Sequence, residues 1–268
     1  MEYYIPDIIL EQDYDVQTDT LPEKFGGLPI GLKLEHWPKC QDCGKPQTFV
    51  AQFSYSSKRL DLGRDGRFLF IFQCSHNPGM CETWSHSSGA NACLIVEPEE
   101  LVSAATSSAK PTSTSWLSKL KNNNAQAVNA PQEQPPTEKE VYISSWLAKD
   151  DILDVEVINS FYDDSKYLNI SDEIIEKVTW STRLGGVPRW IQSADEYPKP
   201  NWVFIGQLDC AYSFLKPPSV SKKWIQTDLE NFEGRTHYTN GPNFGMGLAY
   251  LFIKNTEDIP QAKMFWQC

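Results

Sequence analysis

The chain has 268 residues, of which 40 % are hydrophobic, 12 % aromatic and 22 % charged, which excludes a disordered, collagen-like or coiled-coil chain and predicts a soluble globular protein. Its formal net charge of −11 has the wrong sign for neutralising phosphates, so we expect no nucleic-acid partner and favour a basic protein. The longest apolar runs, Phe68 to Phe72 and Leu248 to Ile253, are far shorter than the roughly 20 residues of a membrane helix, so we expect no membrane span.

The first 23 residues are acidic and contain neither lysine nor arginine. Four carboxylates of this segment, Glu11, Asp13, Asp15 and Asp19, are candidates for contacting a basic partner, whereas a solvated arm is the simpler interpretation of such a charge run. The start of the chain lacks the basic, apolar and small-residue succession of an export signal. We therefore expect a cytoplasmic protein whose seven cysteines are reduced thiols or metal ligands.

A glycine-rich turn follows the acidic segment. Residues 25–29, with the sequence FGGLP, are typical of the entry to a strand, because glycine permits a positive φ and proline cannot donate within a central sheet. Dense apolar residues over 49–53 and 67–72 predict two buried strands after this turn.

Four cysteines flank these two strands with the spacing of metal ligands. Cys40 and Cys43 form a C-x-x-C pair followed by glycine, and Cys74 and Cys81 form a second pair. A hairpin of the two intervening strands would bring both pairs to one edge of a sheet, where four thiolates can hold one structural zinc ion in a tetrahedron. The same four thiolates could hold an iron–sulfur cluster instead.

Other interpretations of the cysteines stay open in the sequence. His76 could replace Cys74 or Cys81 as a ligand, Cys93 is a further candidate, and the cysteines could also be small buried hydrophobic residues. A redox function of the C-x-x-C pair is disfavoured, because the pair follows Trp37 in a loop and does not open a helix. A zinc ion held by four cysteines has no open coordination position, which favours a structural role.

The composition changes between residues 102 and 140. This stretch is rich in Ser, Ala, Thr, Asn, Gln and Pro and cannot bury enough apolar surface to offset its ordering entropy, so we predict a low-complexity linker. The linker separates a first unit, residues 1–101, which contains the cysteine pairs, from a second unit, residues 141–268.

The second unit repeats the pattern of the first unit in the same order. A glycine turn at 184–188 precedes apolar stretches at 204–208 and 247–253, with a long insertion over residues 211–244. Helical signal is sparse, and the best helix is predicted over Ser171 to Thr182. The predicted fold class is α+β, sheet-dominated, with two pseudo-repeated antiparallel β subdomains and few helices.

No catalytic motif is recognisable in the sequence. It lacks a nucleophile elbow, a phosphate-cradling glycine loop with lysine and a zinc-protease helix motif, and its four histidines have no nearby nucleophile in a familiar arrangement. We therefore expect no enzymatic activity, and an enzyme with a cleft between the two repeats is the least favoured alternative.

The motifs together resemble two protein families. The glycine turn, the apolar stretch with its glutamine (Gln52 or Gln207) and the aromatic strand, in two copies, resemble the YwqG-like family of bacterial proteins of uncharacterised function. The first copy, with its C-x-x-C pair, is also similar to the N-terminal half of the programmed cell death protein two family. The resemblance covers most of residues 21–97 and 183–254 and departs from the first family at 243–247, where a Trp-Gly-Asp element is usual.

The resemblance implies binding in place of catalysis. YwqG-like genes occur near bacterial toxin loci, where small acidic proteins neutralise toxins, and the eukaryotic relatives are chaperones of a ribosomal protein. Both kinds of partner are basic, in agreement with the net charge of −11. We expect a non-enzymatic protein-binding protein, namely an immunity protein that neutralises a basic toxin, with a chaperone of a basic ribosomal protein as the alternative.

Overall fold

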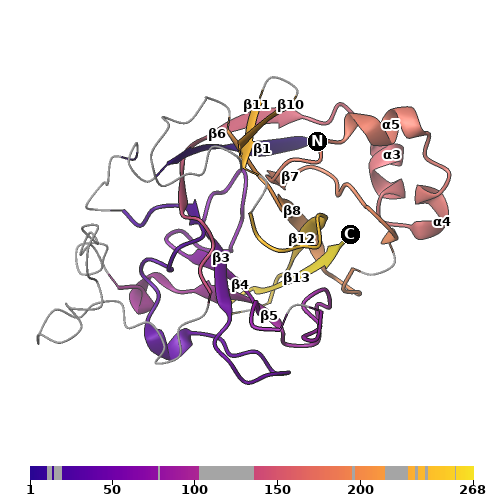
Figure 1. Ribbon diagram of the computed structural model, residues 1–268. Helices are drawn as coiled ribbons and strands as arrows, with labels where there is room; N and C mark the ends of the chain where they lie inside the picture. Colours follow the sequence, from indigo (N-terminus) through magenta and orange to yellow (C-terminus); the bar gives the residue numbers. More distant parts are fainter. Residues whose placement is uncertain are drawn as a thin grey trace, which may run out of the picture.

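The computed structural model is dominated by one antiparallel sheet, which confirms the predicted sheet-rich character (Figure 1). The structure describes residues 1–10, 14, 20–77, 79–102, 136–194, 197–214, 229–232, 235–238, 241–256 and 258–268. The ten strands of the sheet are β1 (Glu2–Leu10), β2 (Lys24–Phe25), β3 (Thr48–Ser54), β4 (Phe68–Gln73), β5 (Asn91–Val96), β6 (Val141–Asp150), β7 (Arg183–Gly185), β8 (Val203–Asp209), β12 (Leu248–Lys254) and β13 (Gln261–Gln267). Their order is β13-β12-β8-β7-β1-β6-β2-β3-β4-β5.

The sheet curls until its two end strands, β5 and β13, lie in contact, although no ladder of hydrogen bonds joins them in the described part of the chain. The backbone N–H of Trp266 on β13 donates to the carbonyl oxygen of Trp84 at 3.3 Å. The two indole rings pack edge to face with their centroids 6.3 Å apart. The sheet is therefore nearly closed, and it surrounds an apolar cluster that includes Phe53, Leu69 and Leu251.

The N-terminal segment forms the centre of this sheet. Strand β1 pairs with β6 from Glu2 to Leu10 and with β7 at Tyr3 and Tyr4. Six of its side chains are buried, and the carboxylate of Glu2 is exposed. The solvated-arm interpretation is therefore wrong for residues 2–10, because the carboxylates of this segment are interspersed with apolar side chains that pack inside the sheet.

Strands from both predicted units interleave at this centre. Strand β6, from residues 141–268, lies between β1 and β2, whereas β1 lies between β6 and β7. Residues on both sides of the predicted linker therefore contribute to one sheet and to one hydrophobic interior. Most of the linker itself, residues 103–135, lies outside the described residues.

The two glycine turns enter the sheet at β2 and β7 and depend on glycine for the same reason. Gly26 and Gly185 have φ angles of 62° and 80°. A Cβ atom on Gly26 would lie 2.0 Å from the carbonyl oxygen of Lys139, and one on Gly185 would lie 2.9 Å from that of Glu2. Both turns thus require a positive φ and a close approach of two backbones, which glycine alone tolerates.

A buried glutamine carboxamide ties each glycine turn to the following strand. Gln52 on β3 accepts from the N–H of Ile30 at 2.8 Å and donates at 2.7 Å to the carbonyl two positions before β2. Gln207 on β8 accepts from the N–H of Arg189 at 3.0 Å and donates at 3.3 Å to the carbonyl two positions before β7. The two glutamines therefore satisfy matching backbone groups in the two halves of the chain.

A buried cationic side chain also donates a hydrogen bond to the backbone of each glycine turn. The ammonium of Lys24 donates to the carbonyl oxygen of Leu28 at 2.7 Å, and the guanidinium of Arg183 donates to that of Val187. Arg183 is fully buried and pairs with Asp151 at 2.9 Å, which supplies the countercharge that a buried cation requires.

The helices gather on one side of the second half, at the right of Figure 1. They are α3 (Val155–Ser160), α4 (Asp164–Tyr167) and α5 (Asp172–Lys177). The described residues of the first half contain two 3₁₀ turns, η2 (Leu34–His36) and η3 (Pro98–Glu100). Within the insertion between β8 and β12, a separate sheet contains β9 (Tyr212–Phe214), β10 (Leu229–Phe232) and β11 (Arg235–Tyr238).

Helix α5 is shorter than the predicted helix over Ser171 to Thr182, since it ends at Lys177. Val178 adopts an extended conformation and is buried in the aromatic cluster beneath the helices. The carbonyl oxygens of Thr179 and Ser181 accept hydrogen bonds from the carboxamide of Gln207. Tertiary packing and these two hydrogen bonds therefore end the helix early.

Candidate metal centre

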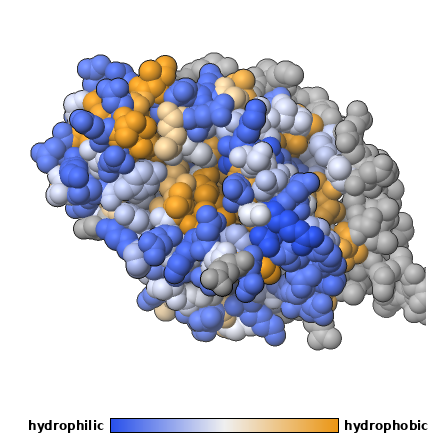
Figure 2. All heavy atoms as spheres, turned by 180° about the vertical axis from the view of Figure 1, so that it is seen from behind, coloured by the Kyte–Doolittle hydropathy of each residue, from blue (hydrophilic) through white to orange (hydrophobic). Residues whose placement is uncertain are grey.

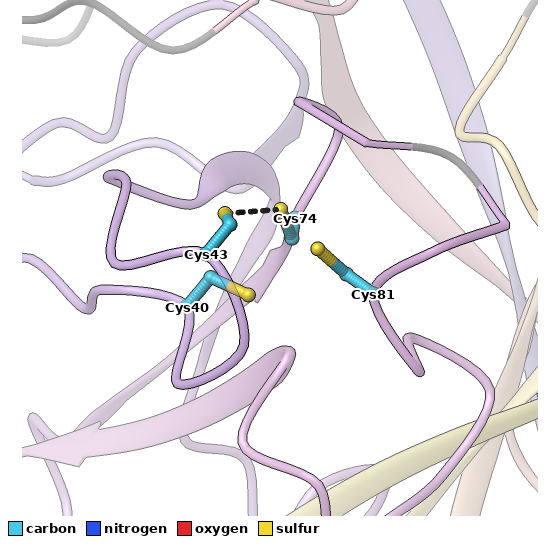
Figure 3. A group of neighbouring side chains, drawn as sticks. All are labelled: Cys40, Cys43, Cys74 and Cys81. Atoms are coloured by element: carbon cyan, nitrogen blue, oxygen red, sulfur yellow. Dashed lines mark hydrogen bonds between the residues drawn. The ribbon is translucent and has the colours of Figure 1, made fainter.

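The first cysteine pair lies on a tight turn between β2 and β3. The backbone N–H of Cys40 donates to the carbonyl oxygen of Lys45 at 2.8 Å, and the N–H of Gly44 donates back to that of Cys40 at 2.8 Å. Gly44 has a φ of 72°, which glycine adopts without strain and which reverses the chain directly after Cys43. Both sulfurs of the C-x-x-C pair therefore project from one side of the turn (Figure 3).

The second pair reaches the same place because β3 and β4 form the predicted hairpin. Thr48, near the first pair, is paired with Gln73, the last residue before Cys74. The N–H of Cys74 donates to the carbonyl of Ala90 at 2.8 Å, and the N–H of Cys81 donates to that of Asn77 at 3.1 Å. The loop after β4 therefore folds back and carries its two sulfurs over the first turn.

The four sulfur atoms form one compact group. The Sγ atoms of Cys40, Cys43, Cys74 and Cys81 all lie within 4.8 Å of one another, and those of Cys43 and Cys74 are 3.6 Å apart. Figure 3 shows the four side chains converging on a common centre. A tetrahedral ion with metal–sulfur bonds of about 2.3 Å separates its ligands by about 3.8 Å. The arrangement therefore fits one metal ion, as the spacing of the cysteines predicts.

Backbone amides contribute to the electrostatics of the group. Burial acts to raise the pKa of the Cys43 thiol, but the Lys45 backbone and the neighbouring thiols, among them that of Cys74 with its sulfur 3.6 Å away, lower the pKa. At Cys74 and Cys81 burial dominates and raises the pKa of both thiols. Four thiolates in this buried position therefore need a cation to compensate their charge, which a metal ion supplies.

Two alternative ligands from the sequence lie outside the sulfur group. The imidazole of His76 lies with its Nε2 atom 3.1 Å from the carbonyl oxygen of Pro46. Cys93 lies on β5 opposite Ile71 and packs against the main apolar cluster, where burial raises its pKa to about 12. Neither residue belongs to the group of four that the structure brings together.

The candidate partner-binding carboxylates cannot be placed in the same way. Glu11, Asp13, Asp15 and Asp19 lie outside the described residues. Their proposed contact with a basic partner therefore stays a prediction.

Supporting groups around the sulfurs were not foreseen from the sequence. The carbonyl oxygen of Gly89 accepts from the N–H of Gln41 at 3.1 Å and from the side chain of Gln47 at 2.9 Å. The carboxylate of Asp42 accepts from the N–H of Glu82 at 2.8 Å, which links the two cysteine loops directly. Only the role of Asp42 could have been inferred from the sequence, because this residue lies between Cys40 and Cys43.

No family model matches this chain, and no curated protein is significantly similar to it. Among the helices that the structure describes, none has both the length and the apolar character that a membrane crossing requires.

Proposed function

We propose that this chain is a non-enzymatic protein-binding protein whose fold is stabilised by one structural metal ion. The group of four convergent cysteine sulfurs supports the structural metal ion of this proposal, and the net charge of −11 supports the protein-binding part. An ion with four protein ligands has no vacant position for water or substrate, so its contribution is to folding. None of the seven cysteines forms a disulfide, which agrees with a reducing compartment, and the proposed location is the cytoplasm.

Zinc is the metal that we propose for this centre. Sulfurs within 4.8 Å of one another suit a single ion, whereas an iron–sulfur cluster places several iron and sulfide atoms between its thiolates. Zinc prefers four thiolates in a tetrahedron and has no redox chemistry, which agrees with a purely structural role.

The partner that we propose is one basic protein. The formal net charge of −11 favours a positively charged partner through long-range attraction, which accelerates association and weakens with salt. The resemblance to the YwqG-like family supports a toxin as this partner and an immunity function for the chain. The carboxylates of the segment 11–19 are the proposed contacts.

Capture of the partner from the native cells tests this function. The tagged chain is immobilised, washed at low and then at high salt, and its bound proteins are identified and quantified by mass spectrometry. One stoichiometric basic toxin that is released by salt supports immunity, and its activity should be abolished by the purified chain. Recovery of no basic protein from cells that contain the toxin locus contradicts the proposal.

A chaperone of a basic ribosomal protein is the second candidate, since the same net charge favours it and the first cysteine turn resembles that of the chaperone family. The two candidates differ in what the loss of the gene does. Loss of a chaperone gene causes a growth defect even in cells that contain no toxin. Loss of an immunity gene leaves growth unchanged until the toxin is present.

We also propose that the two halves of the sheet are copies of one β unit. The matching hydrogen bonds of Gln52 and Gln207 support this proposal, as do the buried cations Lys24 and Arg183 at corresponding positions. The strand order supports it too, because β1 pairs with β7 and β6 pairs with β2 on either side of the central β1–β6 pair.

A further inference from the structure

The side of the molecule that carries the helices concentrates exposed apolar side chains. Five large apolar side chains of the described residues are at least 72 % exposed, and three of these, Ile152, Val155 and Leu168, lie between β6 and α5. Figure 2 shows apolar side chains gathered at its upper left, the side on which the helices lie. Single apolar residues scattered over a surface are ordinary, whereas a concentration of them indicates a site of interaction.

Ile152 is the most exposed of these three residues, and its backbone conformation is strained. Its side chain is 88 % exposed, and its φ of 48° lies in the left-handed region, where a β-branched residue is an outlier. The turn is fixed by its neighbours. The carboxylate of Asp150 accepts the N–H of Ile152 at 2.9 Å, and the buried carboxylate of Asp151 pairs with Arg183 at 2.9 Å. These contacts hold the Ile152 side chain outward, where packing within the described residues does not cover it.

Helix α3 continues this apolar surface. Val155, its first residue, is 72 % exposed, whereas Val157 and Ile158 pack against the aromatic cluster beneath the helices. Ile152 and Val155 are three positions apart in the sequence, so their Cα atoms lie within about 11 Å of each other. One short segment of a partner can therefore contact both side chains.

Two carboxylates without an ion pair flank Val155. Asp154 and Glu156 are exposed and form no ion pair within the described residues, and the side chain of Asp154 does not cap α3 although it stands at the N-cap position. The wider segment 152–177 contains seven carboxylates and two lysines, a formal charge of −5. Both lysines pair with carboxylates of the segment, at 3.4 and 3.1 Å. The apolar surface therefore lies within an excess of negative charge.

The sign of this charge selects the class of partner. In a dimer formed through this surface, the carboxylates of two copies would face each other, and nucleic acid or an anionic membrane would be repelled in the same way. Lysine or arginine side chains of another protein compensate the carboxylates, while its apolar side chains cover Ile152 and Val155. The surface thus fits a protein segment that is both basic and apolar.

We propose that Ile152, Asp154, Val155 and Glu156, here called the helical face, form a docking surface for a basic protein segment. Ile152 is the apolar anchor, and Asp154 and Glu156 contact the basic side chains around it. This chemistry follows from the residues of the helical face. The identity of the segment as part of the partner in the proposed function rests on that function.

A designed peptide tests the proposal without knowledge of the native partner. The probe is an octapeptide of six lysines and two leucines, the leucines three positions apart, acetylated and amidated at its ends. It is titrated into the full metal-loaded chain up to millimolar concentration. A carbodiimide then joins its lysines to the carboxylates that they contact, and mass spectrometry identifies the adducts. We expect them at Asp154 and Glu156. Equal yields at Asp65 and Glu82, two exposed carboxylates elsewhere, contradict the proposal, as does the absence of binding.

The anchor is tested with a variant that preserves the turn. Ile152→Asn removes the apolar side chain, and asparagine tolerates a left-handed φ, so the Tm should not fall. This variant should bind the peptide at least about fivefold more weakly. A second peptide, with serines in place of the leucines, should bind the parent and the variant alike, because it has no apolar side chain to place on Ile152. Equal binding of the leucine peptide to both chains overturns the proposal.

Met246→Asn is the matched control for the anchor. Met246 also has a left-handed φ, of 66°, and is 93 % exposed, but residues 240–252 contain no carboxylate. Met246 precedes β12, and three strands of the sheet separate β12 from β6, which Ile152 follows. The control should bind the peptide as the parent does. An equal loss in Ile152→Asn and Met246→Asn would show that the peptide contacts any exposed apolar residue, against the proposal.

The charge preference is tested with two double variants. Asp154→Asn combined with Glu156→Gln should weaken peptide binding about fivefold, in the range of exposed ion pairs. Asp65→Asn combined with Glu82→Gln is the control, because it removes the same charge from exposed positions in the first half of the chain. An equal loss in both double variants assigns the effect to net charge and contradicts the role of the helical face.

The outcomes of these tests and of the capture experiment can be told apart. If the peptide binds the helical face but no basic protein is captured from the native cells, the docking surface stands and the proposed function fails. If the parent and Ile152→Asn capture a basic partner equally, the proposed function stands and the helical face is not its site.

Discussion

At the scale of single residues, the four cysteines and the two buried glutamines hold loops and turns of the fold to the sheet. Each cysteine sulfur lies within 4.8 Å of the other three, so the loss of one ligand affects the whole centre. Each glutamine satisfies backbone groups that lie inside the protein, where water cannot replace it.

The first prediction concerns the metal ligands. Cys43→Ser should lower both the bound metal and the thermal stability, because a structural metal ion contributes folding free energy. A loss of about 3 kcal/mol corresponds to a decrease in Tm of about 10 °C for a chain of this size. Metal analysis and calorimetry measure the two effects. The control is Cys268→Ser, since Cys268 is exposed and lies outside the sulfur group, and equal metal content in both variants would remove Cys43 from the site.

The second prediction concerns the glutamines. Gln52→Leu and Gln207→Leu should each destabilise the chain by about 2 kcal/mol, because each leaves a buried N–H and a buried carbonyl without a partner. Chemical denaturation measures the change. Gln261→Leu, at an exposed position, is the control and should stay within about 0.5 kcal/mol of the parent. A negligible effect at only one of the two glutamines would count against their equivalence.

At the scale of elements, the sequence predicts the strands that are continuous apolar runs and misses those that are not. Strands β3, β4, β8 and β12 match the predicted stretches to within one residue at each end, because nearly all of their side chains are buried. The sequence misses strand β6, since most of it, Ser144 to Asp150, mixes polar with apolar residues and is largely exposed, so it contains no continuous buried apolar run. Strand β1 was missed because Glu2 and Asp7 gave its segment the appearance of a solvated arm.

The third prediction concerns the ion pair that anchors the end of β5. The hydrogen bond from Arg67 holds the pKa of Glu97 below its ordinary value of 4.5, and Arg64 adds to this effect. The stabilisation is therefore present above the ordinary pKa and is lost as the pH falls through the lowered pKa of the folded state.

Replacement of this carboxylate should reveal the pH dependence. Glu97→Gln should cost about 1 kcal/mol of unfolding free energy at pH 7, and the difference from the parent should shrink as the pH falls below 4.5. Urea denaturation over a pH series measures both values. A difference that stays constant down to pH 2 would contradict a role for the ionised carboxylate.

At the scale of the whole molecule, the cysteine loops connect the first half of the chain to the last strand. The loop that carries Cys81 continues to Trp84, whose carbonyl accepts the N–H of Trp266 on β13. The ring of His86 also packs edge to face on Phe265, with centroids 6.4 Å apart. Such contacts between distant segments could not be predicted, because they depend on how far the sheet curls, whereas the cysteine spacing is a local signal.

The fourth prediction follows from this connection. Removal of the metal with a chelator should accelerate hydrogen exchange in β13, although β13 contributes no ligand, because the loop that holds it loses its anchor at Cys81. Exchange in β8, which the cysteine loops do not pair with, should change little and serves as the internal control. Equal acceleration in both strands would indicate general unfolding in place of a local release.

Native mass spectrometry of the purified chain shows whether the four cysteines hold a structural zinc ion. We expect a folded species that carries one zinc ion in the parent and in Cys268→Ser and none in Cys43→Ser. A folded chain with four free thiols and no metal, or one that carries iron and sulfide, would contradict this expectation.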